Sequence, residues 1–223
     1  MDLKAQDLLA RFAVYGRFYE MKIAGVSELL RDRLEIAPRE RALSDIVSGE
    51  PDLLVVMMNP GASRPLEALW NAGQNQGFTA AQPDRTQYQI MQLMLAAQEA
   101  GLPWASARIL NLSDLRTPKS AVLLEKLHAY RADDSHSLFS KSRQTECRAL
   151  FERTSTPVLC AWGLNRSFAP LAKAALAAAD GHSLLGLTAD GLAYRHPLPQ
   201  RQDQQLQWLT QVKAQLCEIK SQR

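Results

Sequence analysis

The stretch DLLVVMMNPGAS, from Asp52 to Ser63, decides the fold class of this chain. An unbroken apolar run occupies positions 53–58 and is rich in β-branched and large side chains, which is typical of a strand buried on both faces of a parallel sheet. Asn59-Pro60-Gly61 ends the strand, because proline cannot donate to a ladder and glycine accepts backbone angles that other residues resist. Open α/β sheets bind ligands at the carboxyl ends of their strands. The loop at 59–63 is therefore expected to belong to a binding site.

The remainder of the chain alternates predicted strands with predicted helices. Three further strands are expected at 107–112, 157–162 and 182–188. Helices are expected at 84–100, 119–130, 142–153, 165–179 and 202–219. Strands separated by helices predict an α/β protein with a central four-stranded parallel sheet covered on both faces, a three-layer αβα arrangement.

The flanking segments are predicted from weaker patterns. Apolar spacing predicts helices at 3–14 and 27–34, so residues 1–50 are expected to form a helical N-terminal extension. The core then covers 51–200 and a C-terminal helix covers 201–223, all within a single domain. Residues 64–71 are expected to be a helix whose N-terminus faces an anion. Residues 71–85, rich in glycine, glutamine and asparagine, are expected to be a ligand-covering loop.

Composition bounds the classes of function. No apolar run reaches the roughly 20 residues needed to cross a bilayer, and MDLKAQDLLARF has no basic start or apolar block of a signal peptide, so a cytoplasmic protein with no membrane partner is expected. The three cysteines lack C-x-x-C spacing and the histidines are scattered, so no metal site and no cofactor is expected. A formal charge of +3 and a pI near 8.8 are compatible with nucleic acid as a partner.

An aromatic and basic stretch at 11–22 has two interpretations. Its arginines and aromatic rings are suited to phosphates and stacked bases. The favoured alternative is a helix-packing patch with solvated cations, since such mixtures are common.

Four segments resemble the uracil-DNA glycosylase superfamily in type and in order. They are MMNPGAS at 57–63, ILNLSDLR at 109–116, PVLCAWGLNRSFAPLAKAAL at 157–176 and RHPLPQ at 195–200. The superfamily has a water-positioning loop after its first strand, an asparagine closing its second, a W-G turn after its third and an H-P or N-P loop after its fourth. The resemblance implies a uracil-DNA glycosylase-like fold with strand order 2-1-3-4.

A whole-length resemblance also exists to the bacterial and phage family called domain of unknown function 1643. The matching pieces are MMNPGAS, NLSDLR, AWG and GLTADGLAYRHPLP. That family implies no established activity, so function has to be argued from the site and not from the fold.

The glycosylase resemblance implies a role for each matching residue. Asn59, in the loop with Pro60 and Gly61, orients the attacking water. Asn111 reads the edge of an extruded base, since an amide offers both a donor and an acceptor. His196 donates a hydrogen bond to the leaving base. Trp70 or Phe78 would stack on the base. Arg116 would contact a phosphate, and Pro197 with Leu198 would form the wedge loop.

Two departures from the superfamily pattern weaken the case for catalysis. Met57 stands where a glycine usually lets the base approach the backbone, and Asn59 cannot act as a general base because an amide does not accept a proton at neutral pH. Both Asn59 and Asn111 also have a purely structural alternative, as turn-capping or loop-bonding side chains.

Three functions stay open from the sequence. The first is a DNA glycosylase-like hydrolase, and the second is a non-catalytic nucleic-acid or nucleotide-binding module of the same fold. The third is a protein-interaction module, which leaves the alignment of the four loops unexplained.

Overall fold

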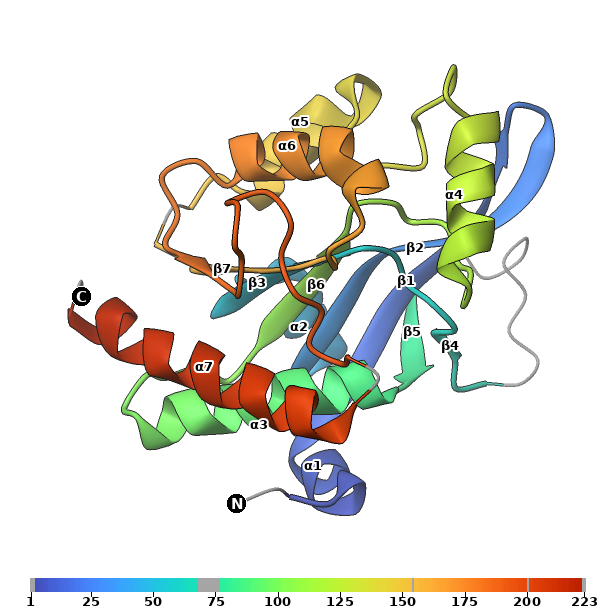
Figure 1. Ribbon diagram of the computed structural model, residues 1–223. Helices are drawn as coiled ribbons and strands as arrows, with labels where there is room; N and C mark the ends of the chain where they lie inside the picture. Colours follow the sequence, from blue (N-terminus) through green and yellow to red (C-terminus); the bar gives the residue numbers. More distant parts are fainter. Residues whose placement is uncertain (1–2, 68–76, 154, 200, 222–223) are drawn as a thin grey trace.

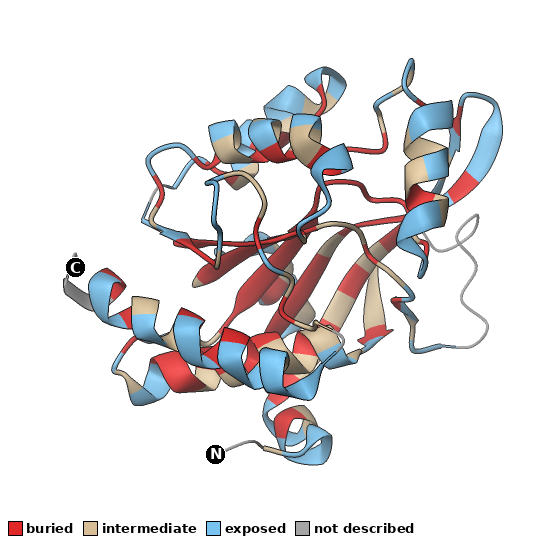
Figure 2. Ribbon diagram, in the orientation of Figure 1, coloured by how far each residue is buried: buried red, intermediate tan, exposed pale blue. Residues whose placement is uncertain are grey.

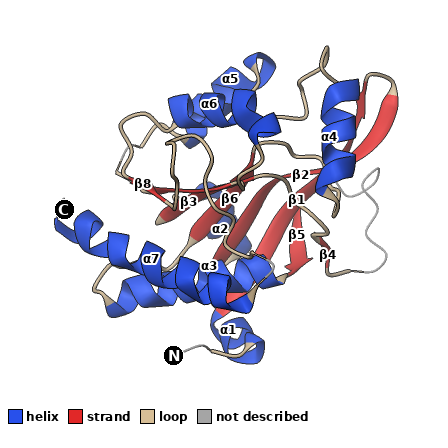
Figure 3. Ribbon diagram, in the orientation of Figure 1, coloured by secondary structure: helices blue, strands red, loops and turns tan. Residues whose placement is uncertain are grey.

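A mixed sheet of eight strands forms the centre of the computed structural model, which describes residues 3–67, 77–153, 155–199 and 201–221 (Figures 1 and 3). The sheet order is β4-β5-β1-β2-β6-β3-β7-β8. The strands are β1 Phe12–Ile23, β2 Val26–Pro38, β3 Leu53–Met57, β4 Arg64–Pro65, β5 Gly77–Gln82, β6 Ala107–Asn111, β7 Val158–Ala161 and β8 Leu184–Leu185.

Helices cover both faces of the sheet, so the α/β class and the layering are as predicted. The helices are α1 Ala5–Arg11, α2 Leu43–Ser48, α3 Arg85–Glu99, α4 Ser120–Ala129, α5 Gln144–Leu150, α6 Ala169–Ala178 and α7 Gln202–Ser221. One apolar core lies between the sheet and α1, α3 and α7, and a second lies between the sheet and α4, α5 and α6 (Figure 1). The central strands lie between these two layers and are buried along their length (Figure 2).

The parallel half of the sheet matches the predicted strands. β3 pairs in parallel with β6 on one side and with β7 on the other, and β8 follows β7. Numbered along the chain, these four strands lie in the order 2-1-3-4. β3 is buried at all five positions, as expected for its continuous apolar run. The expectation of a sheet made of these four strands alone is wrong, because four antiparallel strands extend it beyond β6.

The predicted helical N-terminal extension is wrong over most of its length. Residues 12–38 form the long antiparallel hairpin β1-β2, and among described residues 3–50 only α1 and α2 are α-helical. The burial of β1 alternates along most of the strand, which is the period of a sheet with one face on the core. Its turn is Ala24-Gly25, and both residues have positive φ, the signature of a type I′ hairpin turn. The usual sequence signal of that turn, Asn-Gly, is absent here.

Two other predictions also fail where strands replace loops or helices. The helix expected at 64–71 is the short strand β4 in its described part, and the loop expected at 71–85 contains β5. The strand expected at 182–188 is reduced to β8. The helix expected at 84–100 is confirmed, and Asp84 caps it by accepting hydrogen bonds from the N–H groups of Thr86 and Gln87.

None of the described helices is both long enough and apolar enough to cross a membrane.

Candidate functional site

The loop after β3 is fixed by the side chain of Asn59. Its Nδ2 donates to the carbonyl oxygen of Leu115 at 3.1 Å and to that of Thr117 at 2.8 Å. Because both partners are acceptors, the orientation of the amide is determined, and Oδ1 is its remaining polar atom. The structure therefore gives Asn59 the role of joining two strand-end loops, and it leaves an acceptor suited to orienting a water molecule.

Asn111, at the end of β6, is fully buried and bonded to Arg31 of β2. Its Nδ2 donates to the carbonyl oxygen of Arg31 at 3.2 Å, and its Oδ1 accepts from Arg31 Nη2 at 3.4 Å. Since its exposed fraction is 0%, the side chain holds an arginine in place and does not offer an edge to a ligand from solvent.

A β-bulge decides which face Arg31 occupies. Arg17 faces Arg33 across the hairpin, whereas Phe18 faces Arg31, so Asp32 is an extra residue in β2. The bulge puts Arg31 on the same face as Phe18, toward the core under α3 and α7. A Cβ built on Gly16, which lies on that face, would stand 3.4 Å from Arg31 Cδ. In a regular ladder, Asp32 would occupy this place and Arg31 would face the opposite side.

Arg31 is a buried cation with incomplete hydrogen bonding. It is 2% exposed, and its Nε and Nη1 have no hydrogen-bond partner among the described residues. Burial lowers its pKa to about 10, and the nearby charges of Asp84, Asp114 and Asp32 partly oppose that shift.

Arg116 lies against Phe18, the cross-strand partner of this arginine, and Arg116 is bonded to Ser63. Arg116 Nε donates to the carbonyl oxygen of Ser63 at 2.7 Å, and its guanidinium lies 5.2 Å from the centre of the Phe18 ring. Burial lowers the pKa of Arg116, and its charge also lowers that of Arg31. Ser63 is 1% exposed, and its hydroxyl lacks a partner among the described residues.

His196 is held in one tautomer at the end of the loop that follows β8. Its Nδ1 accepts a hydrogen bond from the Leu198 N–H at 3.1 Å. Burial lowers the pKa of His196 from its usual value near 6.5. The imidazole is therefore neutral at pH 7 and carries its proton on Nε2, so Nε2–H is a fixed hydrogen-bond donor.

A cavity of about 350 Å³ adjoins His196 between its loop, the turn after β7 and helix α7. This volume falls in the range of small-molecule pockets. Its lining includes apolar side chains, one exposed cation and a row of α7 amides: Leu164, Leu187, Arg195, Gln204, Gln207 and Gln211. The structure thus pairs a fixed donor with amides that offer both donors and acceptors.

Asp84 connects the two halves of the site electrostatically. Its negative charge raises the pKa of both Arg31 and His196. We name the set Arg31, Asn59, Ser63, Asp84, Asn111, Arg116 and His196 the strand-end site.

Several residues predicted from the sequence lie elsewhere or have other surroundings. Phe78 packs under Arg33, 5.0 Å from its guanidinium carbon to the ring centre, and β5 is separated from β7 by four strands. It therefore does not join His196. Trp70 lies outside the described residues. Pro60 and Pro197 are buried and Gly61 is half-buried with φ +63°, whereas Leu198 faces a hollow lined by α1, α3 and α7.

Of the two placements open to Met57, in a base pocket or in the core, the structure shows the core. Its side chain is 6% exposed and belongs to the core under α3 and α7. Sequence reasoning assigned no role to Arg31 or Asp84 or to the α7 glutamines, and it took Ser63 only as the end of the loop. Nothing local distinguishes Arg31 from the neighbouring Arg33, because only the bulge turns the two side chains in different directions.

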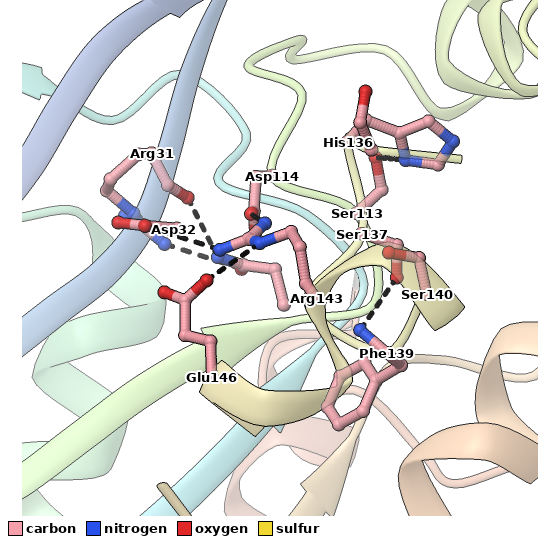
Figure 4. Close-up of polar contacts among 12 residues, drawn as sticks. Arg31, Asp32, Ser113, Asp114, His136, Ser137, Phe139, Ser140, Arg143 and Glu146 are labelled. Atoms are coloured by element: carbon pink, nitrogen blue, oxygen red, sulfur yellow. Dashed lines mark hydrogen bonds and ion pairs between the residues drawn. The ribbon is translucent and has the colours of Figure 1, made fainter. Parts of the chain in front are cut away.

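An ion-pair cluster supports the site from the opposite face of the hairpin (Figure 4). Arg143 lies among the carboxylates of Asp32, Asp114 and Glu146, and Arg17 pairs with Asp32 and Glu146. Burial raises the pKa of Asp114, and the ion pair with Arg143 opposes this shift. The cluster fastens β2 to the loop after β6 and to α5.

The aromatic and basic stretch at 11–22 is therefore a strand of the hairpin and not the expected helix-packing patch. Phe18 is buried in the core, and Arg17 belongs to the ion-pair cluster.

Within the described residues, no group of three or more His, Cys, Asp or Glu side chains is placed to hold a metal ion. Comparisons of the chain with protein-family models, with curated proteins and with solved structures find no match.

Proposed function

We propose that this protein recognises a nucleobase, in nucleic acid or in a nucleotide, at the cavity beside His196. The observation that carries the proposal is the fixed Nε2–H donor of His196 at the rim of a cavity lined by amides. Bases present donors and acceptors along their edges, and Gln side chains match such edges. Leu164 and Leu187 offer apolar contact to the faces of a base. The resemblance to the uracil-DNA glycosylase superfamily supports the same ligand class.

The surface charge beside the cavity is also suited to a nucleic-acid backbone. Arg195 is exposed and lines the cavity, so its guanidinium is available to a phosphate. A binding module is favoured over an enzyme because Asn59 is an amide and cannot act as a general base.

Hydrolysis of an N-glycosidic bond is the second candidate, and one observation favours it. The Asn59 amide is oriented by two carbonyl groups, which fixes the direction of its Oδ1. An oriented acceptor for water and a neutral imidazole donor for the leaving base are the two groups that such a reaction needs.

The binding proposal is tested by gel retention of single- and double-stranded oligonucleotides carrying uracil, hypoxanthine, xanthine or a mismatch. We expect retention whose log affinity falls linearly with log salt concentration. Arg195→Ala should weaken binding and reduce the salt slope by about 1, whereas Arg201→Ala, an exposed arginine paired with Asp203, should have little effect. Absence of retention with every oligonucleotide and of binding to free nucleosides and nucleotides would contradict the proposal.

Alkali treatment of the same samples tests hydrolysis, because alkali cleaves the abasic strand that base release leaves. Cleavage that is lost in His196→Ala and kept in His128→Ala, an exposed histidine on α4, would establish a glycosylase. Retention without cleavage would leave the binding module.

A further inference from the structure

We infer that Arg31, Ser63 and Arg116 form an oxyanion site that receives the phosphate group of a nucleotide or of a phosphorylated oligonucleotide end. Phosphate binding depends on these three side chains alone, whereas the identity of the attached group as a nucleoside rests on the proposed function.

The first step of the argument is the incomplete pairing of Arg31. Its guanidinium is 2% exposed and makes one side-chain hydrogen bond, the 3.4 Å contact from Nη2 to Asn111. Within the described chain, no carboxylate lies within 4.0 Å of it, and Nε and Nη1 remain unpartnered. A buried guanidinium without an anion is unfavourable, because burial removes its hydration and nothing replaces it. An anion that bonds to these nitrogens would restore the missing interactions.

The neighbouring arginine in the same strand provides the contrast. Arg33 donates to Glu35 at 2.7 Å and to the carbonyl oxygen of Val47 at 3.2 Å. Glu35 also accepts from Arg108 at 2.7 Å. Arg33 therefore has a carboxylate partner and a carbonyl partner, whereas the Nε and Nη1 donors of Arg31 have none among the described residues.

Ser63 and Arg116 supply the other donors. Ser63 is 1% exposed and its hydroxyl is unpartnered in the described structure, while the Ser63 carbonyl oxygen holds Arg116. Arg116 stacks on Phe18, the residue that faces Arg31 across the hairpin. Arg31 of β2 and Arg116 of the loop after β6 thus both lie at Phe18, and Ser63 of the loop after β3 is bonded to Arg116. A phosphate group has three strong acceptor oxygens and suits donors that come from several directions.

Three carboxylates act against an anion here, and all three have partners. Asp84 accepts from the N–H groups of Thr86 and Gln87 at the start of α3, where the helix dipole offsets negative charge. Asp114 pairs with Arg143. Asp32, on the other face of the bulge, pairs with Arg17 and Arg143. Arg116 is half-exposed, so one of the three donor residues reaches solvent.

The test measures thermal unfolding of the full chain with inorganic phosphate, a nucleoside, and the matching nucleoside 5′-monophosphate, all at constant ionic strength. Phosphate at a hundredfold excess over its Kd should raise the unfolding midpoint by roughly 5–10 °C. The monophosphate should bind at least about tenfold more tightly than the nucleoside. Oligonucleotides with and without a 5′-phosphate distinguish a strand end from a free nucleotide as the source.

Arg31→Met and Ser63→Ala should abolish or strongly reduce the phosphate response. Arg31→Met removes an unpaired buried charge, so without phosphate its unfolding midpoint should equal or exceed that of the wild type. Arg33→Met is the matched control, and it should lower the midpoint but keep the full response. An unchanged phosphate response in Arg31→Met, or no response in the wild type, would overturn the inference. Nucleoside binding that depends on His196 while phosphate has no effect would leave the proposed function intact and reject only this site.

Discussion

At the scale of one residue, Asn59 is a predicted functional group that also stabilises the structure. The sequence suggested either a water-orienting amide or a turn cap, and the structure shows the amide donating to Leu115 and Thr117. Both acceptor residues are buried. Loss of the amide therefore leaves carbonyl groups that water cannot readily satisfy.

We predict that Asn59→Ala lowers the free energy of unfolding by about 1–3 kcal/mol, the usual effect of leaving buried polar groups unpaired. Asn59→Asp should lower it further, because a carboxylate cannot donate to two carbonyl oxygens. Urea denaturation measures both. The control is Asn165→Ala, which removes one exposed cap bond to the Ser167 N–H. Equal stability of Asn59→Ala and the wild type would show that the two bonds contribute nothing.

At the scale of elements, the β1-β2 hairpin determines what the site contains. Its bulge at Asp32 places Arg31 toward α3 and α7, and its turn closes with two residues at positive φ, Ala24 at 48° and Gly25 at 83°. Alanine is unfavourable in the left-handed region because its Cβ approaches the carbonyl oxygen. The turn is therefore formed at the expense of some stability.

We predict that Ala24→Asn raises the free energy of unfolding by roughly 0.5–1 kcal/mol, since asparagine adopts positive φ more readily. Gly25→Ala should lower it, although a Cβ at Gly25 meets no atom within 4 Å, because the strain is purely conformational. Thermal unfolding compares the two variants. A gain in Gly25→Ala would contradict the assigned turn type.

At the scale of the whole molecule, the ion-pair cluster joins parts that are distant in sequence. Arg143 at the start of α5 reaches Asp32 of the hairpin and Asp114 of the loop after β6. The Asp114 side chain is fully buried and that of Arg143 is 15% exposed. Removing one partner from such a cluster leaves buried charge uncompensated.

We predict that Arg143→Met lowers the free energy of unfolding by about 3–5 kcal/mol, the range for breaking a buried pair by removing one partner. Arg153→Met removes an arginine whose pair with Glu50 is solvent-exposed, and it should change stability by less than about 1 kcal/mol. Guanidinium chloride denaturation measures both variants. Similar small effects would show that the cluster does not fasten the hairpin.

The sequence by itself determined the parallel half of the fold. β3 and β7 are continuous apolar runs, and β6 is apolar apart from Arg108 and Asn111; such strands are buried in a sheet covered on both faces. α3 has its own capping residue, Asp84. These signals are local, because each segment carries its apolar pattern and its stop residues within a few positions. The loop around Asn59 and the position of His196 after the last parallel strand followed from the same patterns.

Only the tertiary structure decided the antiparallel half and the contents of the site. The hairpin turn is Ala-Gly and lacks the usual asparagine. Gly16 interrupts the apolar residues on the inward face of β1, which weakened the alternating pattern that predicts a strand. Arg31 and Arg33 are equivalent in sequence, and a one-residue bulge makes one the open donor of the site and the other a paired structural residue. Register across two strands and the partners of a buried charge depend on residues far apart in the chain, so local pattern does not specify them.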